Sequence, residues 1–90
     1  IKESFMRQFL ILGIFIYIYR SGKTTTKEIA ERFEVSPRTV YRYINSICEA
    51  GVPIITKAGY GGGVYIMDGF KLESLFYTED ERRKIEKALA

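Results

Sequence analysis

The stretch TTKEIAERFEVSPRTVYRY, residues 25–43, decides the fold of this chain because it contains the start signals of two successive helices. Thr25 and Glu28 have the Thr-x-x-Glu spacing of a capping box, in which the hydroxyl and the carboxylate each satisfy a free backbone N–H. Glu28 also precedes Arg32 by four positions, a spacing at which opposite charges can pair. The pattern predicts a short helix that ends near Glu34, with an apolar face made of Ile29, Ala30 and Phe33.

A second helix is predicted from Ser36 to Gly51, after a short connection. Ser36 is a favourable N-cap residue, and Pro37 fits the first helical position, where its missing N–H costs nothing. Gly51 fits the end of this helix, and Pro53 prevents its continuation. One face of the helix is apolar and is expected to be buried: Val40, Ile44, Ile47 and Cys48.

Two β-prone runs, residues 54–57 and 64–67, flank a glycine-rich loop at residues 58–63 and predict a hairpin whose loop projects. The loop is not a dinucleotide-binding fingerprint, because no helix follows it. Two helices joined by a short turn and followed by a hairpin make a helix-turn-helix with a wing. The predicted fold is therefore an α+β, mostly α, winged helix-turn-helix with three helices, a hairpin wing and a C-terminal helix.

The first predicted helix, residues 3–20, carries more apolar surface than one core-facing stripe requires. The residues that recur at helical spacing, and that are expected to face the core, are Met6, Phe9, Leu10, Phe15 and Ile18. The uncharged run at residues 9–19 is shorter than the roughly 20 residues of a membrane span, so no membrane role is expected. We expect the surplus surface either to form a homodimer or to pack against the closing helix after Thr78.

The expected domain organisation is a winged helix-turn-helix at residues 1–69, followed by a linker and the start of a further helix at residues 70–90. Thr78 and Glu81 repeat the Thr-x-x-Glu spacing and open this last helix. Because no stop signal follows it, we expect the helix to be truncated and the chain to be a fragment of a longer protein.

Composition limits the chemistry available to this chain. It has 90 residues and a net charge of +3, with nine Lys/Arg against five Asp/Glu in residues 1–67 but five against six in residues 68–90. Cys48 is the single cysteine and there is no histidine, which excludes an internal disulfide and makes a zinc site implausible. We expect no metal, no cofactor and a reducing, cytoplasmic compartment. No catalytic constellation is present, so an enzyme is not expected, and a fragment of a larger enzyme is the minor alternative.

The exposed face of the second helix is the candidate for reading base edges. Arg38, Arg42 and Asn45 lie at i, i+4 and i+7 and therefore share one face. Arg can bind guanine and Asn can bind adenine in the major groove. Tyr41 also points away from the apolar stripe and is expected to stack on a sugar or touch a thymine methyl group. The alternative is a solvated face without a ligand.

Phosphate contacts are expected at two further places. Thr26 and Lys27 open the first short helix, where free N–H groups and the helix dipole favour an anion. Lys57 and Tyr60 belong to the hairpin, whose glycines let the backbone approach a phosphate or the minor groove. The alternative is that the threonines only cap the helix and that the lysines are solvated.

Several motifs resemble those of a known family. Residues 25–33 and 35–42 resemble the DeoR-like winged helix-turn-helix regulators. The runs EAGVPI at 49–54 and GGGVY at 61–65 are similar to the N-terminal domain of bacterial WYL-domain transcription regulators. The run LFYTEDE at 75–81 is similar to the lead-in to that family's next region. The resemblance covers residues 6–85, and the order and spacing of its motifs are more specific than any one of them.

The resemblance implies a bacterial or phage transcription regulator that binds double-stranded operator DNA sequence-specifically, usually as a homodimer. It implies an effector-binding domain in a region absent from this chain. Carried over by position, the DNA-contact candidates are Ser36, Arg38, Thr39 and Arg42. Tyr43 stands where the family usually has Asp, so the packing or docking of the helix is expected to differ. The alternative function is a winged helix that binds proteins, which the apolar first helix favours.

Overall fold

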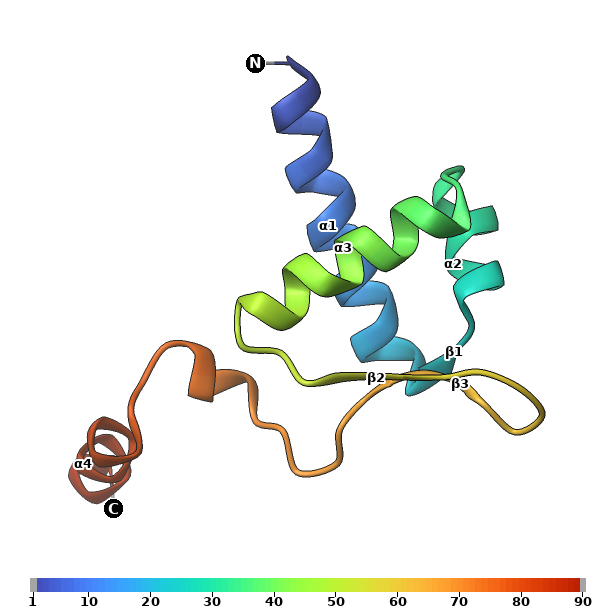
Figure 1. Ribbon diagram of the computed structural model, residues 1–90. Coiled ribbons are helices and arrows are strands. Elements are labelled where there is room, and N and C mark those ends of the chain that lie inside the picture. The colour runs from blue at the N-terminus through green and yellow to red at the C-terminus, as the bar shows by residue number, and fades with distance from the viewer. Residues whose placement is uncertain (1, 90) are drawn as a thin grey trace.

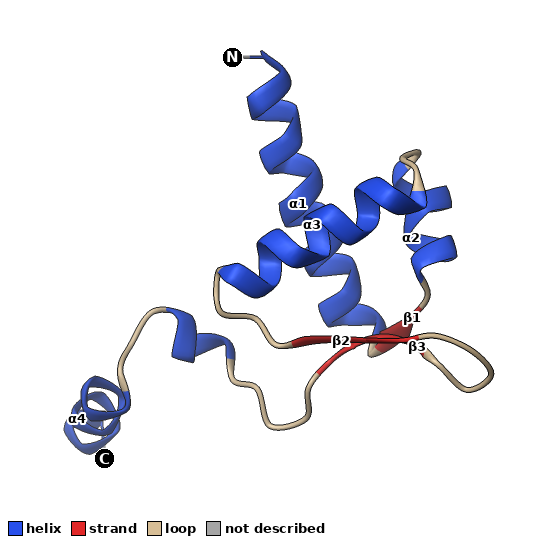
Figure 2. Ribbon diagram, in the orientation of Figure 1, coloured by secondary structure: helices blue, strands red, loops and turns tan. Residues whose placement is uncertain are grey.

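The computed structural model describes residues 2–89, with side chains from residue 6 onward, and has the winged helix-turn-helix architecture (Figure 1). Four helices and a small sheet make it mostly helical, which confirms the predicted α+β class (Figure 2). In chain order the elements are α1 (Lys2–Ser21), β1 (Lys23–Thr24), α2 (Thr26–Phe33), α3 (Pro37–Glu49), β2 (Ile54–Lys57), β3 (Gly63–Ile66), a 3₁₀ helix (Leu72–Leu75) and α4 (Glu79–Leu89).

The α2–turn–α3 unit is built by the two caps that the sequence predicts. Thr25 Oγ1 accepts a hydrogen bond from the Glu28 N–H at 3.0 Å, and Ser36 Oγ accepts one from the Thr39 N–H at 3.1 Å. Between the helices, Glu34 adopts the left-handed conformation with φ of 54°, and its N–H donates to the Ala30 carbonyl. This left-handed residue ends α2 and turns the chain directly into α3.

The core lies where α1, α2 and α3 meet one face of the sheet. Ile14, Ile18, Ile29, Val40 and Val64 have almost no exposed surface, so every one of these elements contributes to the core. Tyr43 is half-buried and packs against the core from α3. The ring at the position where the resemblance predicts Asp is therefore part of the packing of α3. The remaining buried hydrophobic residues are Ala30, Ile44, Ile47 and Val52.

The face of α1 that meets the core differs from the predicted stripe. Ile14 and Ile18 are buried and Ile11 and Phe15 pack beside them, whereas Met6 and Phe9 are more than half exposed. The N-terminal part of α1 projects beyond the other helices, so residues there cannot reach the core (Figure 1). Only Phe15 and Ile18 of the predicted stripe have the expected contact with the core, and Leu10 is half-buried.

The sheet has a third strand that the sequence does not predict. β3 lies in the middle, with β2 on one side and β1 on the other, and both pairings are antiparallel. In β1, Lys23 pairs with Tyr65 and Thr24 pairs with Val64. Two residues are too few to show the alternation of a strand, so only the distant partner β3 gives them extended structure. β1 joins the end of α1 to the cap of α2.

Three local predictions are wrong, one for Cys48 and two for Glu28. Cys48 is exposed rather than buried, because it lies at the rim of the apolar stripe, where its Sγ is 3.8 Å from the Ile54 carbonyl oxygen. The Glu28 carboxylate bonds neither the cap N–H nor Arg32. It accepts a hydrogen bond from the Thr24 hydroxyl at 2.7 Å, and the Arg32 guanidinium lies 4.9 Å from the centre of the Tyr17 ring.

The last helix begins with the complete capping box that the sequence predicts. Thr78 Oγ1 accepts from the Glu81 N–H at 3.2 Å, and Glu81 Oε1 accepts from the Thr78 N–H at 3.0 Å. The hydrogen bonds from the Thr78 backbone and side chain lower the pKa of Glu81. α4 lies apart from α1, so among the described residues the apolar surface of α1 does not dock on this helix as predicted (Figure 1).

Candidate nucleic-acid interface

The outer face of α3 is polar and open to solvent along its whole length. Arg38, Arg42 and Asn45 are all exposed, and the opposite face carries the buried Val40, Ile44 and Ile47. The three polar side chains therefore share one free face, as their spacing predicts. Held on the core by its apolar side, α3 presents two guanidinium groups and one amide to an approaching ligand.

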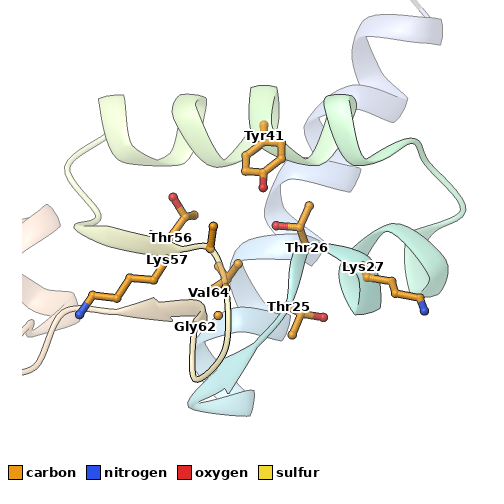
Figure 3. A pocket seen from close by; sticks show the side chains of 11 residues that line it. Thr25, Thr26, Lys27, Tyr41, Thr56, Lys57, Gly62 and Val64 are labelled. Carbon is orange, nitrogen blue, oxygen red and sulfur yellow. The ribbon is translucent and has the colours of Figure 1, made fainter.

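Beside this face is a cleft of about 400 Å³ that three separate segments form. The start of α2 and its cap form one wall, the end of β2 and the wing loop form the other, and Tyr41 of α3 closes the space between them (Figure 3). The cleft includes hydroxyl groups from α2, α3 and β2. Lining residues are Thr25, Thr26, Lys27, Tyr41, Thr56, Lys57, Ala58, Gly59, Gly62, Gly63 and Val64.

Four of the predicted DNA-contact residues meet at this cleft although they are far apart in sequence: Thr26, Lys27, Tyr41 and Lys57. The ring of Tyr41 points from α3 toward the strands, with its hydroxyl near Thr26 (Figure 3). The Lys27 and Lys57 side chains reach outward on opposite sides of the opening (Figure 3). An anion in the cleft would thus lie between two ammonium groups.

The N-terminus of α2 adds favourable electrostatics to the same cleft. Thr25 satisfies the Glu28 N–H, whereas the first N–H groups of a helix have no acceptor within the helix. The N–H groups of Thr26 and Lys27 are therefore available to an acceptor, and the helix dipole makes this end partly positive. The Glu28 carboxylate, in the first turn of α2, is occupied by its hydrogen bond from Thr24.

The wing loop is held in a tight turn. The Gly62 N–H donates to the Gly59 carbonyl at 3.0 Å, and the Lys23 ammonium from β1 donates to the Gly61 carbonyl at 2.8 Å. A side chain at position 62 would put its Cβ 2.2 Å from the Lys57 carbonyl oxygen, so only glycine fits there. Tyr60 is fully exposed at the tip of the loop and does not line the cleft.

Ser36 and Thr39 lie at the start of α3 and do not line the cleft. Ser36 Oγ caps α3, and its hydroxyl also bonds Thr39 Oγ1 at 3.0 Å. Thr39 is half-buried. Both hydroxyls therefore have a partner that shapes the start of α3, which is the physical role that an N-cap serine implies.

Several cleft residues escape sequence reasoning. The sequence predicts only a capping role for Thr25, and it places Thr56 and Val64 in the hairpin without a further role. Alternation along β2 gives no sign that Thr56 faces α2, because the pairing of β1 with β3 sets that proximity. The contact between Lys23 and the wing has no sequence signal for the same reason.

The described residues contain no candidate metal site and no candidate membrane span, but they also form a further groove. No group of three or more His, Cys, Asp or Glu side chains that could hold a metal ion occurs among them. Within the same residues, no helix is both long and apolar enough to cross a bilayer. A larger, more apolar groove of about 640 Å³ lies between α1, the end of α3 and Leu75.

Comparison with known proteins agrees with this architecture. Residues 7–64 match a family model described as an HTH domain. YobV of Bacillus subtilis (strain 168), called an uncharacterised HTH-type transcriptional regulator, is 40% identical over 79 residues. Those residues are 88% of this chain but 25% of YobV, so the chain spans a quarter of the length of that relative. No solved structure matches the chain. Because the family match runs from α1 to β3 and covers most of the chain, the protein belongs to the HTH domain family.

Proposed function

We propose that this domain binds double-stranded DNA sequence-specifically and serves a transcription regulator. The observation that carries the proposal is the convergence of the α2 N-terminus, Tyr41 and Lys57 on one cleft directly beside the exposed Arg38–Asn45 face of α3. Such an arrangement offers donors for a phosphate next to donors for base edges. The HTH domain match and the name of the Bacillus relative support the same function.

In the proposed complex, α3 enters the major groove and its exposed residues read base edges. Arg38 and Arg42 each have a guanidinium fork that fits guanine O6 and N7, and the Asn45 amide fits adenine. All three side chains are exposed, so their polar ends are accessible to bases. The Ser36 hydroxyl caps the start of this helix and also bonds the Thr39 hydroxyl.

A backbone phosphate is proposed to occupy the cleft. There it would meet the free N–H groups of Thr26 and Lys27, the Tyr41 hydroxyl and the two flanking ammonium groups. This contact carries no sequence information, but it fixes the depth and angle at which α3 lies in the groove. Tyr60 at the wing tip is proposed to reach the flanking minor groove.

The biological setting is proposed from the resemblance and from the relative. We propose that the chain is the DNA-binding part of a DeoR-like or WYL-type regulator in the cytoplasm, and that residues 1–69 form this unit. Such a regulator would bind its operator as a homodimer, since two-fold proteins match two-fold sites. An effector, if there is one, would bind outside this chain.

The test is a binding series on duplexes selected by this domain from random DNA. Arg42→Ala should weaken binding to the selected site by about 1–3 kcal/mol and relax selection at one base pair. Lys57→Ala should instead weaken binding to selected and scrambled duplexes alike and make the salt dependence shallower by about one counterion. Lys84→Ala on α4 is the matched control and should change neither. If no duplex is selected and none binds at low salt, the proposal is wrong.

A protein-binding function is the second candidate, and the exposed side of α1 favours it. Met6, Phe9, Leu12, Ile16 and Tyr19 are each about half exposed. The same surface suits the proposed homodimer. The two candidates therefore involve the same residues and differ only in the partner, which is either another protein or a second copy of this chain. Sedimentation of the domain alone over a wide range of concentrations would show self-association. A strictly monomeric domain that binds DNA would remove the homodimer through α1.

A further inference from the structure

We propose that Lys23 is a positioning residue, which holds the wing in its DNA-binding arrangement before DNA arrives. The inference rests on the proposed function, because it assigns a role in the same interface. Lys23 belongs to β1, outside both the helix-turn-helix and the hairpin. Its ammonium nevertheless donates to the Gly61 carbonyl at 2.8 Å, across 38 positions of sequence.

The contact includes the stem of the side chain as well as its charge. A Cβ at position 63 would lie 2.9 Å from Lys23 Cε and 3.2 Å from Lys23 Cγ. The stem therefore crosses the bare Cα of Gly63, and the ammonium reaches the carbonyl beyond it. Gly63 also meets the Thr24 backbone, whose carbonyl oxygen would be 2.8 Å from that Cβ. The glycine is needed for this close approach as much as for the turn.

Such a link is useful because the loop would otherwise be loose. Gly59, Gly61 and Gly62 allow the loop many backbone conformations. Binding to DNA would have to select one of them, at a cost in conformational entropy. A link formed in the free protein removes part of that ordering before binding. Tyr60, next to the bonded Gly61, is thereby held at the tip.

The same residue connects the two walls of the cleft. Lys23 holds the wing loop, and Thr25, two residues later, caps α2 and lines the opposite wall. Thr24, between them, pairs with Val64 and bonds Glu28. The Lys23 contact thus joins the wing loop to the strand that leads into the cap of α2.

The test uses Lys23→Met, which keeps an apolar stem and removes the donor, with Lys84→Met as the matched control. In the free protein, exchange of the Gly62 amide, which donates to the Gly59 carbonyl within the loop, should rise severalfold in Lys23→Met and stay unchanged in the control. Affinity for a selected duplex should fall about three- to tenfold, because the wing that Lys23 no longer holds has to be ordered when DNA binds. The denaturation midpoint should hardly move, since the bond is exposed.

A second background separates positioning from direct contact with DNA. In a variant whose residues 58–62 are replaced by a two-residue Asn-Gly turn, Lys23→Met should no longer change affinity. A loss of equal size in both backgrounds would mean that Lys23 itself touches DNA, and unchanged exchange in the free protein would mean that it does not hold the wing. Either result overturns the inference. Failure of the wild type to bind any duplex overturns the proposed function instead, and the exchange data still decide whether Lys23 holds the wing.

Discussion

Replacing Ile14 by alanine tests the orientation of α1, on which the whole core depends. Ile14 is 0% exposed and lies among side chains from α1, α2, α3 and the sheet, whereas Leu12 on the same helix is 53% exposed. Each change to alanine removes three carbon atoms. Burial of an isoleucine side chain contributes about 1.5–3 kcal/mol, and the cavity left in a rigid core adds to the loss. We therefore expect Ile14→Ala to cost about 3–4 kcal/mol and Leu12→Ala less than about 1 kcal/mol.

The assay is urea unfolding followed by far-ultraviolet circular dichroism, with both variants at matched concentration. With a slope of about 1–3 kcal/mol per molar urea, Ile14→Ala should lower the midpoint by roughly 1 M or more. Domains of this size have only about 5–15 kcal/mol of stability, so the difference is easily measured. Equal losses for the two variants would refute the orientation of α1. If Leu12→Ala is costly only at high protein concentration, the exposed face of α1 is a self-association surface instead.

Two further predictions concern helix starts. Ser36→Ala should lower stability by about 1 kcal/mol through loss of the α3 cap, and Ser36→Gly by only a few tenths; equal losses in urea unfolding would argue against the cap. Hydrogen bonds with Thr78 lower the pKa of Glu81 in the folded protein. The ionised carboxylate therefore stabilises α4 fully above the ordinary pKa of 4.5, and this stabilisation is lost as pH falls through the lower pKa of the folded state. In acid, the protection factors of the amides at residues 81–83 should accordingly fall, and Glu81→Gln, which has no carboxyl group to titrate, should remove this pH dependence; an acid response that persists in the variant would contradict the role of the box.

Local signals predict the helix-turn-helix of this chain well, and the physical reason is that caps are local. The Ser36 hydroxyl accepts a hydrogen bond from an N–H in the first turn of α3, and Pro37 occupies that same turn. Their effect on the helix start therefore does not depend on distant residues. The hairpin is similarly local, because two short runs and a glycine-rich loop determine it. The predicted burial of Cys48 is wrong because Cys48 lies at the rim of the apolar stripe, whereas Ile47 in the same turn of α3 is buried.

Orientation of α1 is not local, and sequence pattern alone does not determine it. With apolar residues on nearly every face, the helix offers several stripes of similar hydrophobicity. Shape then decides, because Gly13 lets Phe33 approach α1 closely: a Cβ there would be 3.0 Å from the ring. The stripe next to that glycine, Ile14 and Ile18, is the one that the core takes. The spacing of hydrophobic residues gives no indication that a glycine is the point of closest contact between the two helices.

The candidate site is hardest to predict because no single segment contains it. Its walls come from residues 25–27, 41, 56–59 and 62–64, and β1 brings them together although it has only two residues. Those two residues perform different tasks: Lys23 bonds the wing, and Thr24 bonds Glu28 at the start of α2. Since Thr25 then caps α2, a one-residue insertion between α1 and α2 would break at least one of these three contacts. The connection before α2 therefore constrains the geometry of the cleft, although nothing in its composition distinguishes it from an ordinary loop.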